Sequence, residues 1–214
     1  MRVSREKAAE NRVRIVETAS RLFREGGFEG VSVDAIMNAA GLTHGGFYGH
    51  FGSKDELAAE AVTRALERSV EKQSRYTNLS DLVLEYLSER HCADRANGCA
   101  IAALGADMAR QRNAVRRGLT AHVRAQLDHF SRLLRNGPAA KRRERAITTL
   151  AGMIGALTLA RGVDDPVLSN EILAVARHAF GRAFGGSEQR PPRPKGGFGS
   201  RTLVRAGASG TRDR

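Results

Sequence analysis

The sequence predicts an all-α protein in which helices pack on helices. Its 214 residues are 41% hydrophobic but only 5% aromatic, with no tryptophan, so the apolar residues are mostly Ala, Leu, Val and Ile. Apolar positions recur at the three- and four-residue spacing of a helix face. No segment keeps the alternating polarity of a half-buried strand. The length suits one core or two coupled helical units.

A long predicted helix lies at each end of the N-terminal region. The first is expected over residues 7–25, where apolar side chains keep helical spacing until Gly26-Gly27 supplies a stop. The second begins at Ser53-Lys54-Asp55-Glu56, which has the sequence of a capping box. We expect this helix to extend to about Arg75.

Two short helices are predicted between these long ones. Ser32 is a candidate N-cap for a helix that ends at Ala40. Gly41 then allows a tight turn. Thr43 can cap a second short helix, which ends near His50. Two short helices joined at a glycine form a compact corner, so the sequence predicts a helix-turn-helix.

The helical pattern continues to about residue 185. Its apolar faces lie at 82–87, 101–108, 115–134, 147–157 and 167–184. Asn136-Gly137-Pro138 interrupts this pattern, and Gly162 ends a later helix. Asp165-Pro166 is typical of an N-cap followed by proline at the first helical position. We therefore expect a second, larger helical unit.

The formal net charge of +12 permits nucleic-acid binding but does not locate it. Residues 1–55 contain 8 basic and 7 acidic side chains, so the predicted helix-turn-helix is nearly neutral. The remaining excess lies in residues 56–185 and in the last 29 residues. Charge alone therefore does not identify the DNA-binding region.

The second short helix has an unusual composition. Residues 43–50 read Thr-His-Gly-Gly-Phe-Tyr-Gly-His, with three glycines in eight positions. In a helix these glycines cost roughly 2.5–3 kcal/mol relative to alanine. Missing side chains let a backbone approach phosphates and base edges closely, so the composition predicts a helix in contact with double-stranded DNA.

Polar residues around this helix are candidate DNA contacts. Hydroxyl, imidazole and ammonium groups can hydrogen-bond to phosphate oxygens, which fixes register without reading sequence. The candidates for this role are Ser32, Thr43, Tyr48, His50 and Lys54. His44 is the candidate base-edge reader, with the Gly45 and Gly46 backbone against a thymine methyl. Each residue alone could be an ordinary cap, core residue or surface charge; their joint occurrence supports DNA contact.

Residues 31–57 resemble the DNA-binding region of the TetR (tetracycline-repressor-like) family. Three motifs match together and in register: Gly41-Leu42-Thr43, Phe47-Tyr48-x-His50-Phe51, and Ser53-Lys54-x-Glu56-Leu57. The helix at 7–25, with Phe23, Gly27 and Phe28, fits the first helix of that family. The glycines of residues 43–50 leave few long side chains for base readout, so DNA shape is expected to contribute to specificity.

The resemblance implies a cytoplasmic, all-helical homodimer with a variable C-terminal domain that binds a small effector. The predicted domains are 1–54 for DNA binding, 55–185 for effector binding and dimerisation, and 186–214 as a disordered basic tail. In this arrangement the helices at about 138–162 and 166–185 pair with their copies as a four-helix interface. The small residues Gly152, Gly155 and Ala156 would permit their close approach.

An effector cavity is expected between helices and should be mostly apolar. Its candidate lining residues are Tyr86, Met108, Phe130 and Met153. Plain core packing is the alternative for each of them, because such residues are often simply buried.

The chain has two cysteines, Cys92 and Cys99, which exclude a disulfide framework and fit a reducing cytoplasm. One interpretation is an oxidation sensor in which His91 or Arg95 lowers a thiol pKa. The other is that Cys99 is a small buried hydrophobe. His91, Cys92 and Cys99 have an unusual spacing for zinc, so no metal or other cofactor is predicted.

The function predicted from these features is a sequence-specific transcriptional regulator, a repressor released from its operator by a small effector. The alternative is a non-specific architectural DNA-binding protein, which the basic charge would support. An enzyme is not expected, because the sequence lacks a phosphate-binding glycine loop, a nucleophile elbow and a helical metal-binding His pair. The apolar, uncharged run 146–160 is shorter than the roughly 20 residues of a membrane span. The charged start, which has no apolar core, is not expected to be a signal peptide.

Overall fold

The computed structural model describes residues 4–111 and 113–183, and this part of the chain is all-α, as predicted. The helices are α1 (Arg5–Gly30), α2 (Val33–Ala39), the 3₁₀ helix η1 (His44–Gly49), α3 (Lys54–Gln73), α4 (Leu79–Tyr86), α5 (Glu89–Ala93), α6 (Ala100–Arg110), α7 (Asn113–Leu133), α8 (Ala139–Gly162) and α9 (Pro166–Ala183). The predicted disordered tail, 186–214, lies outside the described residues.

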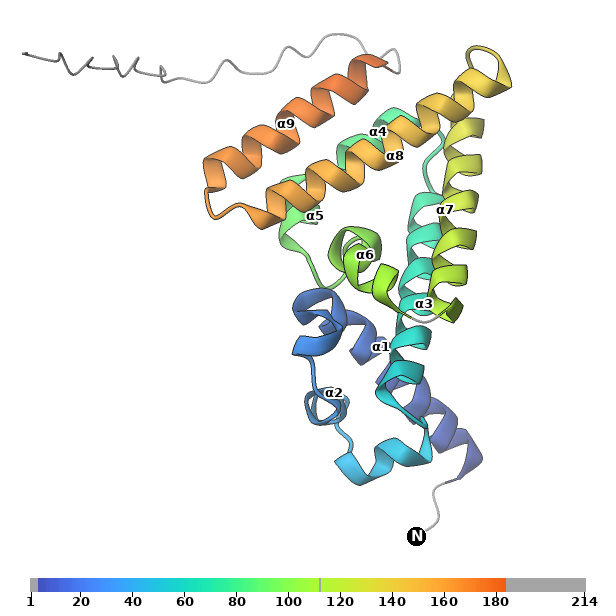
Figure 1. The fold of residues 1–214 in the computed structure, drawn as a ribbon, viewed down its shortest axis with the longest axis vertical. Coiled ribbons are helices and arrows are strands. Elements are labelled where there is room, and N and C mark those ends of the chain that lie inside the picture. Colours follow the sequence, from blue (N-terminus) through green and yellow to red (C-terminus); the bar gives the residue numbers. More distant parts are fainter. Residues whose placement is uncertain (1–3, 112, 184–214) are drawn as a thin grey trace, which may run out of the picture.

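The molecule is elongated, with its N-terminal helices at one end and α8 and α9 at the other (Figure 1). Helix α3 packs against α1 at its start and against α7 further along, so it joins the two ends. Helix α8 lies beside both α7 and α9, and α9 also packs on α4. None of the described helices is long and apolar enough to cross a membrane.

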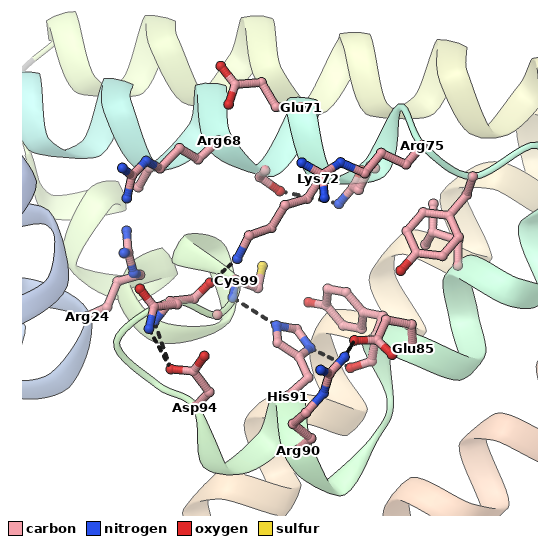
Figure 2. A pocket seen from close by; sticks show the side chains of 18 residues that line it. Arg24, Arg68, Glu71, Lys72, Arg75, Glu85, Arg90, His91, Asp94 and Cys99 are labelled. Carbon is pink, nitrogen blue, oxygen red and sulfur yellow. Dashed lines mark hydrogen bonds and ion pairs between the residues drawn. The ribbon is translucent and has the colours of Figure 1, made fainter.

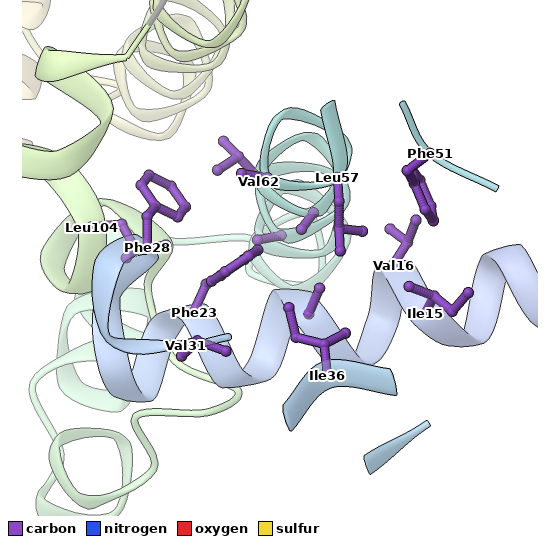
Figure 3. Packing of buried hydrophobic residues seen from close by; sticks show 14 of the residues in the cluster. Ile15, Val16, Phe23, Phe28, Val31, Ile36, Phe51, Leu57, Val62 and Leu104 are labelled. Atoms are coloured by element: carbon purple, nitrogen blue, oxygen red, sulfur yellow. The ribbon is translucent and has the colours of Figure 1, made fainter. Parts of the chain in front are cut away.

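Two hydrophobic clusters follow this division. The first contains α1, α2, η1, the start of α3 and one face of α6. Phe23 on α1 packs edge-on against Phe28, with ring centroids 5.2 Å apart, and Leu57 and Leu104 lie in the same cluster (Figure 3). The second cluster is formed by α4, α7, α8 and α9, and Ile101 and Ala102 of α6 pack against it. Because α6 contributes to both clusters, the N-terminal unit is fixed to the rest of the chain by apolar contacts.

Side-chain caps set most helix starts locally. The side chain of Ser4, Ser32, Ser53, Asn78 or Ser88 accepts a hydrogen bond from the backbone N–H three residues later. The predicted N-caps Ser32 and Ser53 are confirmed. The predicted capping box differs from the structure in one detail. The Glu56 carboxylate accepts a hydrogen bond from the N–H of Gly52, at 2.9 Å, and not from that of Ser53.

Three other predicted details are corrected. The Thr43 side chain makes no capping hydrogen bond, and the helix that follows it is 3₁₀ rather than α. The stop at Gly26-Gly27 is a kink at Gly27, where φ is +73°, and helical turns continue to Gly30. The sequence also gave no sign of α5, which has five residues and no apolar periodicity.

Candidate nucleic-acid interface and cavity

The 3₁₀ helix η1 has one buried face and one exposed face. Phe47 is 1% exposed and stacks on Phe51, with ring centroids 5.7 Å apart. Tyr48, the next residue, is 69% exposed, and its ring meets Phe47 edge-on. Phe47 therefore anchors η1 on the first hydrophobic cluster, and the opposite face is left open to a partner.

All the predicted DNA-contact residues are at least partly exposed. Ser32 before α2, Thr43 before η1 and the η1 residues His44, Gly45, Gly46 and Tyr48 are exposed, while His50 and Lys54 are partly exposed. The Ser32 hydroxyl oxygen already accepts from the N–H of Ala35, so its proton is available to donate. Three successive elements, α2, η1 and α3, thus have exposed or partly exposed hydrogen-bonding groups at or near their starts.

A carboxylate in the first turn of α2 holds the candidate base reader. The Oδ1 atom of Asp34 lies 2.5 Å from Nδ1 of His44. The Tyr48 ring lies edge-on to the same imidazole, at 6.3 Å between centroids. These contacts orient His44 and leave its Nε2 atom as the group that can meet a partner. Nothing in the local sequence pattern links residues 34 and 44, so this pairing was missed.

The corner between α2 and η1 depends on a glycine in a left-handed conformation. Gly41 has φ +67°, and its N–H donates to the carbonyl of Asn38 while Leu42 donates to Met37. These bonds satisfy the last carbonyls of α2 and turn the chain. The predicted turn at Gly41 is confirmed.

The orientation of α1 against α3 is fixed by a second contact that the sequence did not reveal. The Arg12 guanidinium donates to both carboxylate oxygens of Glu60 and lies over the Phe51 ring, 4.4 Å from its centroid. The hydrogen bond to Glu60 raises the pKa of Arg12. The Arg12–Glu60 ion pair thus joins α1 to α3 directly, above the Phe51 ring on which Phe47 stacks.

A cavity of about 670 Å³ lies further along α3, next to α4, α5 and the loop that precedes α6 (Figure 2). Charged side chains from α1, α3 and α5 line much of it, whereas a mostly apolar lining was expected. Tyr86 is one of its lining residues. Met108 is instead fully buried in the first hydrophobic cluster, and Phe130 and Met153 are buried in the second.

His91 joins two segments of this cavity wall. Its Nδ1 lies 2.5 Å from the carbonyl oxygen of Tyr86, and its Nε2 lies 3.2 Å from the backbone nitrogen of Cys99. A neutral ring fits both contacts, because Nδ1–H can donate while Nε2 accepts. Since both nitrogens are engaged, His91 has none free for a zinc ion. Cys99 is buried and Cys92 is partly buried.

His91 and His122 are expected to make the free energy of unfolding depend on pH. Burial is the main cause that lowers the pKa of His91 and of His122. The unfolded chain, with an ordinary histidine pKa of about 6.5, therefore binds more protons than the native one as the pH falls. We expect the free energy of unfolding, measured by urea denaturation, to decrease between about pH 7.5 and pH 5.5.

The variants H91Q and H122Q should each lose part of this acid sensitivity. They would be compared with the wild-type protein in the same urea titrations, followed by circular dichroism. A wild-type stability that is constant or rises as the pH falls over this interval would contradict the assignment of neutral, buried histidines.

Fold and site together define a helix-turn-helix protein with a larger C-terminal helical unit that contains a cavity. Residues 15–61 match the family model described as bacterial regulatory proteins, tetR family. An HTH-type transcriptional regulator of Staphylococcus aureus is 40% identical over 63 residues, which are 29% of this chain and 34% of that relative. The alignment thus spans about a third of the length of the curated relative.

Solved structures extend the similarity to the C-terminal helices. A TetR-family regulator from Cytophaga hutchinsonii has a TM-score of 0.66 at 19% identity, over 83% of this chain and 95% of that one. Another, from Chloroflexus aurantiacus, has a TM-score of 0.64 at 24% identity, over 80% and 94%. At these identities the likeness shows the fold. Residues 15–61 thus match the tetR family of bacterial regulatory proteins, and the rest of the described chain shares the fold of these TetR-family structures.

Proposed function

We propose that the chain is a sequence-specific transcriptional regulator that binds double-stranded DNA as a homodimer and represses until a small effector releases it. One observation carries the proposal: η1 buries Phe47 and exposes a polar, glycine-rich face beside Ser32 and Lys54. A helix held in this way by a preceding helix and a tight turn suits the major groove.

The exposed groups divide into two roles in this proposal. Hydroxyl and imidazole groups of Ser32, Thr43, Tyr48 and His50, with the Lys54 ammonium, contact phosphates and fix the register. His44, oriented by Asp34, contacts a base edge through Nε2. The N-terminus of α3 adds a favourable site for a phosphate beside Lys54.

The homodimer is supported by an apolar surface on α8 and α9. Among the described residues, large exposed apolar side chains on these helices are Ile147, Leu159, Val167, Leu168 and Val175. On α8, Ile147, Ala151, Gly155 and Leu159 follow at four-residue intervals and therefore share one face. A Cβ on Gly155 would meet open space, so a partner helix could approach there closely.

One small residue expected at the dimer interface has another role. A Cβ on Gly152 would lie 2.3 Å from the Phe180 ring of α9. Gly152 therefore allows α8 and α9 of the same chain to pack together. Ala156 is partly buried and packs on the second hydrophobic cluster. Gly155 is the residue of the three that remains available to a partner.

A dimer makes release by an effector mechanically simple. Two recognition helices read half-sites about 34–36 Å apart, or multiples of this distance. An effector that binds more tightly to a conformation with another spacing shifts the population away from the DNA-bound form.

The proposal is tested by selecting bound DNA from a random pool with the full chain, followed by affinity measurements at physiological salt. We expect a palindromic site that is bound at least about 10³-fold more tightly than scrambled DNA. Equal affinity for both DNAs would reject sequence-specific regulation and favour a non-specific architectural protein.

Replacing Gly45 with alanine tests whether the glycines of η1 serve DNA contact. A Cβ at Gly45 would meet nothing within 4 Å in the free protein, so G45A should stabilise it by about 0.4–1 kcal/mol. Against DNA the added methyl group blocks close backbone approach, and we expect operator affinity to fall about tenfold.

Gly118 on α7 supplies the matched control for G45A, because its Cβ would also meet open space. G118A should stabilise the protein to a similar extent and leave operator affinity unchanged. Unfolding titrations and binding isotherms of the two variants would be compared. Unchanged operator affinity in G45A would remove the role assigned to this glycine.

A further inference from the structure

The cavity wall contains a buried arginine without an acidic partner. Arg24, on α1, is 6% exposed, and no described carboxylate lies within ion-pair distance of it. Its Nε donates to the carbonyl of Ala96 at 2.6 Å and one terminal nitrogen donates to Ser20 Oγ at 2.8 Å. Burial, followed by repulsion from Arg68, lowers the pKa of Arg24 to about 10. A buried charge of this kind is costly unless an opposite charge compensates it.

Further cations, on α3 and just after it, lie along the same cavity. Arg68 and Lys72 lie one turn apart on α3, Arg75 lies just beyond its end, and the Lys72 ammonium donates to the carbonyl of Asn97 at 2.9 Å (Figure 2). Arg68 is paired with Glu17, 2.8 Å away. Lys72, like Arg24, makes no ion pair with a described carboxylate. The region bounded by α1 and α3 thus has unpaired positive charge.

The acidic residues of the cavity do not cancel this charge. Five basic side chains line it, counting arginine and lysine, against the three carboxylates of Glu71, Glu85 and Asp94. Glu85 is paired with Arg90. Asp94 attracts Arg24 weakly from a distance, while its oxygen accepts two hydrogen bonds from Asn97. An excess of positive charge therefore remains in the cavity.

A buried hydroxyl beside the Cys99 thiol marks another part of the wall. Tyr86 is 8% exposed, and its phenolic oxygen makes no hydrogen bond of ordinary geometry with any described group. Burial, with the neighbouring Cys99, raises the pKa of Tyr86 well above its usual value, so the hydroxyl stays protonated and can donate. Leaving a buried hydroxyl unpaired is unfavourable, which favours an acceptor from a ligand. Tyr76 and Leu82 add apolar surface to the same lining.

We propose that this cavity binds an anionic amphiphile, a carboxylate joined to an aromatic or aliphatic body. The carboxylate lies against Arg24 and Lys72, the apolar body lies along Leu82 and Tyr76, and a polar atom of the ligand accepts from the Tyr86 hydroxyl. The volume of about 670 Å³ falls within the range of small-molecule sites.

The identification of this ligand as the effector rests on the proposed function; its binding to the cavity does not. Arg24 links the cavity to the DNA-binding region because it lies on α1, which packs on the helix-turn-helix. Its guanidinium also holds the loop before α6 through the carbonyl of Ala96. The Arg161 guanidinium of α8 binds the carbonyls of His91 and Cys92, next to that loop. A ligand at Arg24 therefore contacts the segment between the DNA-binding helices and the proposed dimer interface.

The test is a calorimetric titration of the full chain, without DNA, with 4-phenylbutanoate, 2-naphthoate and decanoate and with the uncharged amide of each. We expect at least one carboxylate to bind with a dissociation constant below about 1 mM and about tenfold or more tightly than its amide. Equal binding of acid and amide, or no binding of any carboxylate at this level, would overturn the proposal.

Variants then locate the binding. K72Q and Y86F should each weaken the carboxylate about fivefold to tenfold, and R24Q should abolish measurable binding. K141Q, an exposed lysine on α8 outside the cavity, should bind as the wild type does. If R24Q does not fold, K72Q and Y86F decide, because Lys72 is exposed and Tyr86 loses only an unpartnered hydroxyl. If K72Q and Y86F both bind the carboxylate with wild-type affinity, the assigned site is overturned.

A second measurement separates this inference from the proposed function. The carboxylate that binds would be added to the complex with the selected DNA, and we expect it to lower operator affinity. Binding to the free chain without any effect on the complex would reject the carboxylate as the effector while the site stands. Failure to select any DNA site would reject the regulator and leave the calorimetric result unaffected.

Discussion

Replacing Phe47 with alanine is expected to destabilise the protein by about 3–5 kcal/mol, as for other large aromatic side chains truncated in a core. Phe47 is 1% exposed, stacks on Phe51 and anchors η1, a helix of six residues with little stability of its own. The ring over which Arg12 lies would lose its neighbour. The free energy of unfolding in urea, followed by circular dichroism, measures this loss.

Tyr48 provides the matched control because it is the adjacent aromatic on the opposite face. At 69% exposure, Y48A should change the free energy of unfolding by no more than about 0.5 kcal/mol. Its operator affinity should nevertheless fall, since the phenolic hydroxyl is a proposed phosphate contact. Equal stability losses in F47A and Y48A would contradict the two-faced description of η1.

Replacing Leu159 with aspartate is expected to convert the proposed dimer into monomers. Leu159 is 61% exposed on the apolar face of α8, and in a two-fold interface each substitution occurs twice. With a loss of about 2 kcal/mol at each copy, the dimer dissociation constant should rise about 10³-fold. Sedimentation equilibrium would measure it directly. Operator affinity should fall in parallel, because the two reading helices would no longer be linked.

Leu84 on α4 is the matched control for Leu159. It is also a leucine with an exposed side chain, 49%, but it is not one of the α8 and α9 residues assigned to the proposed interface. L84D should leave both the oligomeric state and operator affinity unchanged. A monomeric wild-type chain, or an L159D variant that remains dimeric, would contradict the assignment of this face.

Features that depend on neighbouring residues were predictable from the sequence. Ser32 caps α2, and Asp165 accepts from the N–H groups of Val167 and Leu168 at the start of α9, as expected. Gly41 adopts a positive φ where a turn was predicted, and Gly137 does so where the helical pattern was predicted to be interrupted. These outcomes depend on bonds within a few residues, so local chemistry is sufficient to predict them.

The exposed face of η1 was predictable for a related reason. The motif containing Phe47, Tyr48 and His50 places one apolar ring inward and polar groups outward over a few residues. The sequence could not supply the partner of His44, because Asp34 meets it across a turn. Thr43 was expected to cap an α-helix, but η1 is a 3₁₀ helix, in which three glycines provide little preference for the α form.

The cavity could not be predicted from helical periodicity. Met108, Phe130 and Met153 have the spacing of core or lining residues, and periodicity does not distinguish these roles. Arg24 resembles a surface charge in the sequence, yet it is buried because it bonds to Ala96, 72 residues away. Gly152 likewise is next to Phe180 only after α8 and α9 have packed.

The sequence by itself determined that the chain is helical, where most helices begin, and that residues 31–57 form a helix-turn-helix. These properties follow from side-chain periodicity and from hydrogen bonds between near neighbours. The tertiary structure alone decided which buried groups face a cavity, which charges remain unpaired and which apolar face of α8 stays exposed. These properties arise between residues distant in the chain, and they become defined only when the packed helices exclude water.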